Sequence, residues 1–209
     1  MKRNYQKELD KLIEINQQSG IVPTLLLHSC CAPCSSYVIE YLSNFFKVTV
    51  LYFNPNIGEE SEYLKRRDEQ KRLVAEMPTK YPVYFIDGDY HPQDFYSAVK
   101  GLENEPERGR RCSVCFAIRL NYTAEIASKN QFDYFATTLT LSPLKNAEVI
   151  NSIGEGILCE SKYLASDFKK REGYKRSIVL SNKYNLYRQN YCGCVFSKIK
   201  RSAPNLKQT

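Results

Sequence analysis

The sequence predicts an α/β fold in which a mostly parallel sheet of about five strands is flanked by helices. Short apolar, β-rich runs alternate with longer amphipathic or charged stretches, which is the pattern of βαβ units. No internal repeat, low-complexity segment or clean linker interrupts this alternation. We therefore expect a single α/β domain over residues 1–209, with a helical C-terminal part.

The strands are expected where short apolar runs are bounded by turn residues. PTLLLHS is the clearest of these, because it is short, continuous in its apolar residues and bounded by Pro23. KVTVLYFNPNI is closed by an Asn-Pro turn signal. The predicted strands cover residues 23–29, 47–57, 81–87, 131–139 and 161–168.

The helices are expected between these strands. In the second predicted helix Val38, Leu42 and Phe45 recur at helical spacing, and Pro33 suits the first turn. Ser142 is a plausible N-cap for a later helix, since a proline follows it. The predicted helices cover residues 8–18, 32–46, 59–77, 92–102, 112–130 and 142–157, with 103–111 as an exposed loop and the C-terminal part largely helical before Asn190.

Charge and hydropathy narrow the class of protein. The net charge of +7 suits a nucleic-acid partner without requiring one. No apolar run reaches the length of about 18 residues that a membrane-spanning helix needs. The first twenty residues are too polar for a signal peptide and carry too many acids for a transit peptide. We therefore expect a cytoplasmic protein with no membrane contact.

Seven of the eight cysteines fall into three groups, and this clustering is the strongest chemical signal in the chain. In a reducing compartment, clustered cysteines more often bind metal or carry out redox chemistry than form structural disulfides. Cys159 stands alone in GEGILCES, and we expect it to be a buried structural residue.

The first group is Cys30, Cys31 and Cys34, where a predicted strand passes into a helix. Ligands of open parallel sheets bind beyond the carboxyl ends of the strands. The N-terminus of a helix also favours ionisation of a thiol, and the thiolate is both the nucleophile and the metal ligand. Burial as small apolar side chains would explain one cysteine, but not three within five residues.

The second group is Cys112 and Cys115 at the start of another predicted helix. By itself this C-x-x-C motif suits zinc, an iron–sulfur cluster or a redox pair. Together the two groups offer four or five thiolates to one site, which is typical of zinc and of iron–sulfur clusters. The adjacent pair Cys30–Cys31 is awkward for tetrahedral zinc, since neighbouring residues rarely direct both side chains at one ion.

The third group is Cys192 and Cys194, in YRQNYCGCVFSK. The pair could form an easily reduced disulfide bond or add ligands to the metal site. Arginine and tyrosine surround it, and such residues contact phosphates and stack on bases, although a solvated basic face is an equally good explanation. His28 is expected to be a packed strand histidine rather than a ligand.

Four motifs in fixed order, HSCCAPCSS, RRCSVCFAIRL, TTLTLSPLKN and YRQNYCGCVFS, resemble those of the QueH family of epoxyqueuosine reductases. They extend from His28 to Ser197, which is most of the chain. The resemblance implies a Rossmann-like sheet related to the HUP and PP-loop group. It also implies reduction of epoxyqueuosine to queuosine at the wobble position of a tRNA anticodon.

The resemblance further implies a four-iron four-sulfur (4Fe-4S) cluster and an additional iron ion. By motif match, Cys30, Cys31, Cys112 and Cys115 are the expected ligands of the metal centre. This chain has Cys34 where some family members have aspartate. Because either side chain can bind iron, Cys34 is expected to bind the additional iron. The site would be built from residues 28–36 and 110–116 and closed by 187–197.

The catalytic residues are then expected to be cysteines. We predict this role for Cys30, Cys31, Cys34, Cys192 and Cys194, the last two as a redox-active pair that works at the centre or guards it. An electron donor that the sequence does not identify would supply the electrons for this reduction. The residues predicted to contact tRNA phosphates are Arg110, Arg111, Arg119, Lys145 and Arg188.

Three other functions compete with this interpretation. A zinc-binding nucleic-acid module would be colourless and free of iron. A PP-loop enzyme of tRNA thiolation would need an ATP-binding S-G-G-x-D motif, which the chain lacks. A thiol oxidoreductase that uses only its C-x-x-C motif would work without metal.

Overall fold

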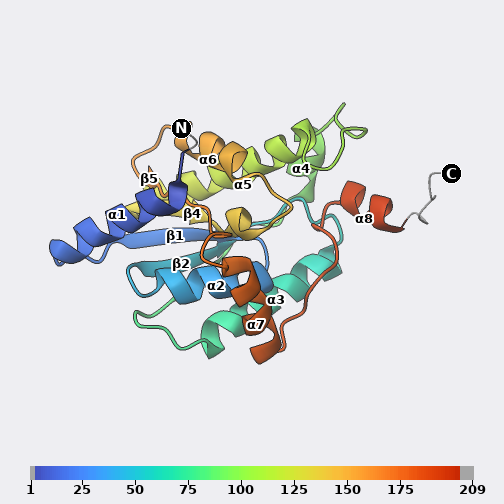
Figure 1. Cartoon of the computed structure of the whole chain (residues 1–209). Coiled ribbons are helices and arrows are strands. Elements are labelled where there is room, and N and C mark those ends of the chain that lie inside the picture. Colours follow the sequence, from blue (N-terminus) through green and yellow to red (C-terminus); the bar gives the residue numbers. More distant parts are fainter. Residues whose placement is uncertain (1–2, 203–209) are drawn as a thin grey trace.

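The computed structural model describes residues 3–202, which are built around a five-stranded sheet (Figure 1). The strands lie in the order β3-β2-β1-β4-β5, and every neighbouring pair is parallel. This arrangement confirms the predicted α/β class. The strands are β1 (Thr24–Ser29), β2 (Lys47–Tyr52), β3 (Tyr84–Asp87), β4 (Tyr134–Thr137) and β5 (Lys162–Tyr163).

Helices cover both faces of this sheet (Figure 1). Because side chains alternate along a strand, Leu25 and Leu27 pack against α1, α2 and α3 on one face, whereas Leu26 packs against α5 on the other. Burial on both faces explains the continuous apolar runs in the strands. The helices are α1 (Tyr5–Gln18), α2 (Ala32–Leu42), α3 (Glu60–Glu76), α4 (Pro92–Ala98), α5 (Arg110–Lys129), α6 (Ala147–Glu155), α7 (Gly173–Lys183) and α8 (Val195–Ser202).

The strand order creates a crevice next to β1. After β1, β2 and β3 the chain returns to the other side of β1 and adds β4, so the direction of the winding reverses between these two strands. In parallel sheets such a reversal opens a binding site at the carboxyl ends of the two strands. The first cysteine group follows β1 at this edge.

The helix predicted over 142–157 begins later than expected. Residues Thr138–Leu141 form a short 3-10 helix, η1, and Ser142 ends it instead of starting α6. The N-cap of α6 is Asn146, whose side chain accepts a hydrogen bond from the backbone N–H of Glu148. Asparagine is as good an N-cap as serine, so local preference did not decide between the two positions.

The C-terminal part is helical as expected, over Gly173–Lys183 and Val195–Ser202. Helix α7 ends before Asn190 because Asn185 takes a left-handed conformation with φ 46°, and an irregular segment follows. One further expectation is wrong. Cys159 is exposed rather than buried, because it lies in the surface connection between α6 and β5 beside Leu158, which is 99% exposed.

Within residues 3–202, no helix combines the length and the apolar character needed to cross a lipid bilayer.

Candidate metal centre

A pocket of about 510 Å³ lies where the first cysteine group follows β1, and cysteine dominates its chemistry. All three groups from the sequence reach it, although they are far apart along the chain. The cysteines that line the pocket are Cys30, Cys31, Cys34, Cys112, Cys115, Cys192 and Cys194. The topology therefore brings together seven of the eight cysteines.

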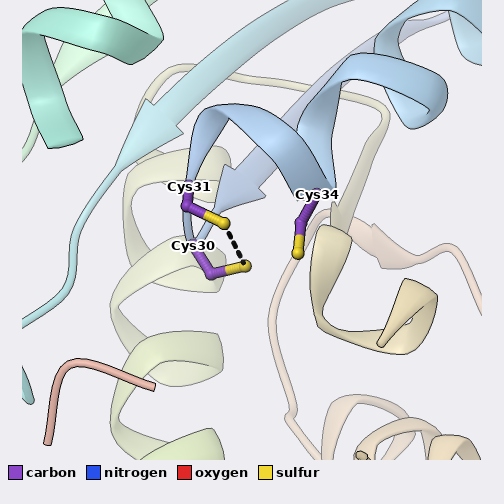
Figure 2. A group of neighbouring side chains, drawn as sticks. All are labelled: Cys30, Cys31 and Cys34. Atoms are coloured by element: carbon purple, nitrogen blue, oxygen red, sulfur yellow. Dashed lines mark hydrogen bonds between the residues drawn. The ribbon is translucent and has the colours of Figure 1, made fainter. Parts of the chain in front are cut away.

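The first group forms a tight triangle of sulfur atoms (Figure 2). The Sγ atoms of Cys30, Cys31 and Cys34 all lie within 4.8 Å of one another, and those of Cys30 and Cys31 are 3.8 Å apart. Cys31 is the N-cap of α2 and has an extended backbone, with φ −177° and ψ 157°. The turn from β1 into α2 thus directs the side chains of two adjacent residues to the same side.

The pKa values of these thiols diverge because the three sulfurs share hydrogen bonds. Contacts with Cys31 and Cys34 lower the pKa of Cys30 well below its usual range, and the charge of Lys145 and the hydroxyl of Thr138 lower it further. The contact with Cys30, together with burial, raises the pKa of Cys31 to about 12. Cys30 is therefore the thiol of the three that loses its proton most readily, and a metal cation would favour deprotonation of all three.

The second group lies at the N-terminal end of α5. The Sγ of Cys112 accepts a hydrogen bond of 3.2 Å from the backbone N–H of Arg108, and the Sγ of Cys115 accepts one of 3.2 Å from the guanidinium of Arg119. Burial raises the pKa of Cys115 to about 12, although the charge of Arg119 opposes this. Both residues line the pocket, but neither belongs to the triangle of sulfur atoms in the first group.

The third group reaches the pocket on the irregular segment after α7. Gly193 between the two cysteines has φ 101°, and a Cβ atom there would lie 2.7 Å from the side chain of Ile57. Glycine is therefore required both by backbone conformation and by space. Cys194 is buried against Phe95 and Cys115. Both thiols are free, as are the other six, so the structure does not support a disulfide bond between Cys192 and Cys194.

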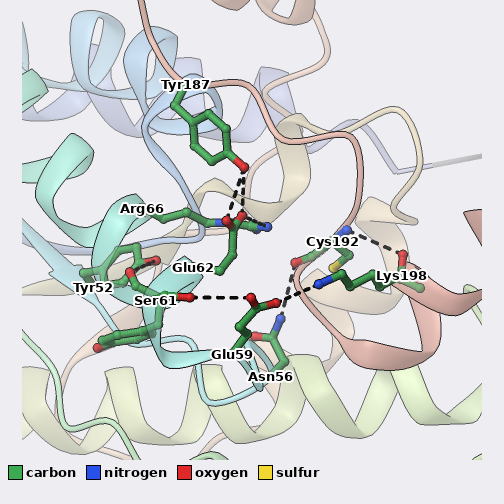
Figure 3. A network of polar contacts seen from close by, with 11 residues as sticks. Tyr52, Asn56, Glu59, Ser61, Glu62, Arg66, Tyr187, Cys192 and Lys198 are labelled. Atoms are coloured by element: carbon green, nitrogen blue, oxygen red, sulfur yellow. Dashed lines mark hydrogen bonds and ion pairs between the residues drawn. The ribbon is translucent and has the colours of Figure 1, made fainter. Parts of the chain in front are cut away.

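Helix α3 holds this C-terminal segment in place (Figure 3). The Tyr187 hydroxyl donates to the carboxylate of Glu62 at 3.2 Å, and the backbone N–H of Tyr187 donates to Glu69 at 2.7 Å. Closer to the cysteines, Lys198 pairs with Glu59 at 2.7 Å, and the side-chain amide of Asn56 donates to the carbonyl of Cys192 at 3.4 Å. These contacts fix the approach of Cys192 to the pocket.

Arg66 provides a further contact between α3 and the C-terminal segment. Its side chain is 2% exposed, and its guanidinium pairs with Glu62 at 2.6 Å and lies 5.0 Å from the ring centroid of Tyr191. The carboxylate of Glu62 therefore accepts a hydrogen bond from the Tyr187 hydroxyl and also neutralises the buried guanidinium of Arg66, which lies against the ring of Tyr191. Buried charges need such partners, so the position of the segment is coupled to the burial of Arg66.

Comparisons with known proteins identify the family to which this chain belongs. Residues 25–200 match the family model described as "Epoxyqueuosine reductase QueH". The chain belongs to the QueH family. It is 45% identical to the epoxyqueuosine reductase QueH of Staphylococcus epidermidis over 206 residues, which cover 96% of this chain and 87% of that protein. It is 36% identical to the QueH of Thermotoga maritima over 188 residues, covering 85% of this chain and 92% of the relative.

A solved structure supports the fold of this QueH family member. NMN synthetase from Francisella tularensis superimposes with a TM-score of 0.50 and 10% sequence identity, over 90% of this chain and 75% of that one. At this identity the likeness concerns the fold alone. Together with the parallel sheet, it confirms the predicted Rossmann-like class.

The structure argues against two of the five predicted phosphate contacts. Arg111 and Arg119 are only 2% and 1% exposed. The guanidinium of Arg111 donates to the backbone carbonyls of Leu102, Glu103 and Glu105, while that of Arg119 faces Cys115. Both line the pocket as buried side chains that already donate hydrogen bonds to these protein acceptors, which makes them poor contacts for the phosphates of an RNA that lies across the outside.

The other three predicted contacts are placed where RNA could reach them. Arg110 and Arg188 are exposed, and Lys145 is half-buried in the pocket wall. Within the described part of the chain, no carboxylate is among the charged groups that act most strongly on Lys145, and Glu107 is the only carboxylate that lines the pocket. The rim is therefore positively charged.

His28 is a packed strand histidine, as predicted. It is fully buried, with Nδ1 2.8 Å from the Thr137 hydroxyl and Nε2 3.0 Å from the Phe53 carbonyl. Burial lowers the pKa of the imidazole to about 3. His28 does not line the pocket, so it supports the sheet edge and is not a candidate ligand.

Sequence reasoning missed Asn54 and the acidic residues of α3. Asn54 follows β2 at the same sheet edge as Cys30, and polar residues after a buried strand are a signal that could have identified it. Glu62 and Glu69 lie in a strongly charged helix, where nothing local separates partners of the C-terminal segment from solvated acids.

Proposed function

We propose that this chain is an epoxyqueuosine reductase, which removes the epoxide oxygen of epoxyqueuosine at the wobble position of a tRNA anticodon and leaves queuosine. In this reaction two C–O bonds break and one carbon–carbon double bond forms. Two electrons and two protons are consumed, and the oxygen leaves as water. The observation that carries the proposal is the convergence of seven cysteines from three distant segments on one pocket, in a member of the QueH family.

The donor set fits an iron–sulfur centre. All candidate ligands are cysteine sulfurs, and pure thiolate sites suit iron–sulfur clusters and zinc. In this proposal Cys30, Cys31, Cys112 and Cys115 hold a 4Fe-4S cluster, and Cys34 helps to hold an additional iron. When bound, such a centre supplies electrons one at a time and a Lewis acid for the epoxide oxygen.

The chain itself positions and shields the substrate. The walls around the cysteines include Phe95, Phe116 and Tyr191, which limit the access of water to the reacting carbons. Residues 187–197 close the pocket over the sites at 28–36 and 110–116, and the whole arrangement would lie in one domain over residues 1–209. Cys192 and Cys194 act as a redox-active pair at this closure. An unidentified donor delivers the electrons in the cytoplasm, where tRNA is modified.

For tRNA binding we retain Arg110, Lys145 and Arg188 as phosphate contacts. We expect the Lys145→Ala and Arg188→Ala variants to bind tRNA more weakly, because each loses a cation at the rim of the pocket. For each variant, the logarithm of the tRNA association constant should fall less steeply with the logarithm of the salt concentration, by about one unit of slope. Filter binding at several salt concentrations measures this slope. Lys129→Ala, which removes an exposed lysine at the far end of α5, is the matched control.

The proposed function is tested by anaerobic purification followed by assay. We expect a coloured protein that contains iron and acid-labile sulfide. With dithionite as reductant, it should convert epoxyqueuosine to queuosine in tRNA, detected by mass spectrometry of the nucleosides. A folded protein that is colourless and free of iron would favour a zinc-binding module. Turnover after complete removal of metal would favour a simple thiol oxidoreductase.

A further inference from the structure

Arg119 is a buried cation with no acidic partner among residues 3–202. It lies in the middle of α5 and is 1% exposed. Its Nε donates to the carbonyl of Cys115 at 3.2 Å, one Nη donates to Asn54 Oδ1 at 3.3 Å, and the other donates to the Sγ of Cys115 at 3.2 Å. Within residues 3–202, none of its hydrogen bonds reaches a carboxylate.

Such a charge requires compensation. Burial of an unpaired guanidinium destabilises the folded protein, because the ion loses its hydration without gaining an opposite charge. The acceptors around Arg119 are a backbone carbonyl, an amide oxygen and a cysteine sulfur, and only the sulfur can carry a negative charge. The site is thus complementary to a thiolate at Cys115, as it would be in a metal-bound state.

Asn54 connects this guanidinium to the other half of the pocket. Its Oδ1 accepts from Arg119, and its Nδ2 donates to the carbonyl of Ser29 at 2.9 Å. Asn54 is 1% exposed, and Ser29 directly precedes Cys30. A short buried chain of hydrogen bonds therefore joins the cysteine that follows β1 to the C-x-x-C motif of α5.

We propose that Arg119 is a positioning residue of the metal centre, which fixes Cys115 relative to Cys30 and raises the reduction potential of the bound cluster. The inference rests on the iron–sulfur part of the proposed function. Reduction adds a negative charge to a cluster, and a nearby cation that donates to a ligand sulfur stabilises the reduced state. Loss of that cation should make the cluster harder to reduce.

The test is a redox titration of the anaerobically reconstituted protein with dithionite, followed by electron paramagnetic resonance of the reduced cluster. We expect the midpoint potential of Arg119→Met to be more negative than that of the wild type. Arg119→Lys keeps the charge but cannot make all three hydrogen bonds, so its shift should be smaller. Arg111→Met is the matched control: it removes a second buried arginine of α5, one that donates to backbone carbonyls instead of a sulfur.

The outcomes separate this inference from the proposed function. A wild type that binds a cluster and an Arg119→Met variant with an unchanged midpoint would overturn the role of Arg119 and leave the reductase proposal intact. Equal shifts in Arg119→Met and Arg111→Met would also overturn it, since they would show a general effect of removing charge. A wild type that takes up no cluster would overturn both proposals.

If Arg119→Met does not fold, Asn54→Ala provides the measurement. This variant keeps Arg119 and its charge but removes the connection to Ser29. We expect it to lose iron to a chelator faster than the wild type, with a midpoint shift in the same direction. Unchanged iron release and an unchanged midpoint would contradict the positioning role.

Discussion

Replacing Cys31 by serine is expected to remove the cluster and to reduce turnover by about a hundredfold or more. Cys31 is 3% exposed, and its sulfur lies 3.8 Å from that of Cys30, so the substitution removes one of the proposed ligands from the centre of the site. Serine is among the best N-cap residues, and Cys31 is the N-cap of α2. The fold should therefore survive the substitution.

Iron content and circular dichroism of the purified variant distinguish loss of metal from loss of structure. The matched control is Cys159→Ser, since Cys159 is exposed and does not line the pocket. It should retain the full content of iron and full turnover. A Cys31→Ser variant with normal iron and normal turnover would remove Cys31 from the ligand set.

The double variant Cys192→Ser/Cys194→Ser is expected to retain its iron while its turnover falls by about a hundredfold or more. The proposed ligands of the cluster lie on β1–α2 and α5, and the third group reaches the pocket on a separate segment held by α3. Loss of these two thiols therefore removes the redox pair but leaves the metal ligands in place.

The single variants make this prediction more specific. Residues that act as a unit are not additive, so Cys192→Ser alone should lose about as much turnover as the double variant. Iron analysis and a single-turnover assay with tRNA measure both properties. Full activity in the double variant would exclude a redox role, and loss of iron in it would instead make these cysteines ligands.

The sequence predicted the strand–helix order and the edge of the sheet at which the cysteines gather. It succeeded because buried parallel strands are continuous apolar runs, and because Cys30 and Cys31 directly follow one of them. The clustering of cysteines pointed to their common role without knowledge of distances. Family motifs then narrowed the chemistry.

The contacts of individual charged residues could not be predicted in this way. In the sequence, Arg111 and Arg119 look like part of a basic RNA-binding surface. In the structure, both lie on the buried side of α5. Only the packing of α5 on the sheet determines which face of the helix is buried. The exposure of Cys159 and the attachment of residues 184–198 to α3 are likewise decided by contacts between segments that are distant in sequence.

The assembly of the pocket from three segments also constrains when the protein can mature. At ~5–20 residues per second, a ribosome needs about 8 to 30 s to proceed from Cys34 to Cys192. During that interval the first thiols exist without the rest of their site, open to oxidants and to stray zinc ions. Cofactor insertion must therefore wait at least until Cys112 and Cys115 have been made, and a chain that terminates before Cys192 would leave the ribosome with its first two cysteine groups uncovered.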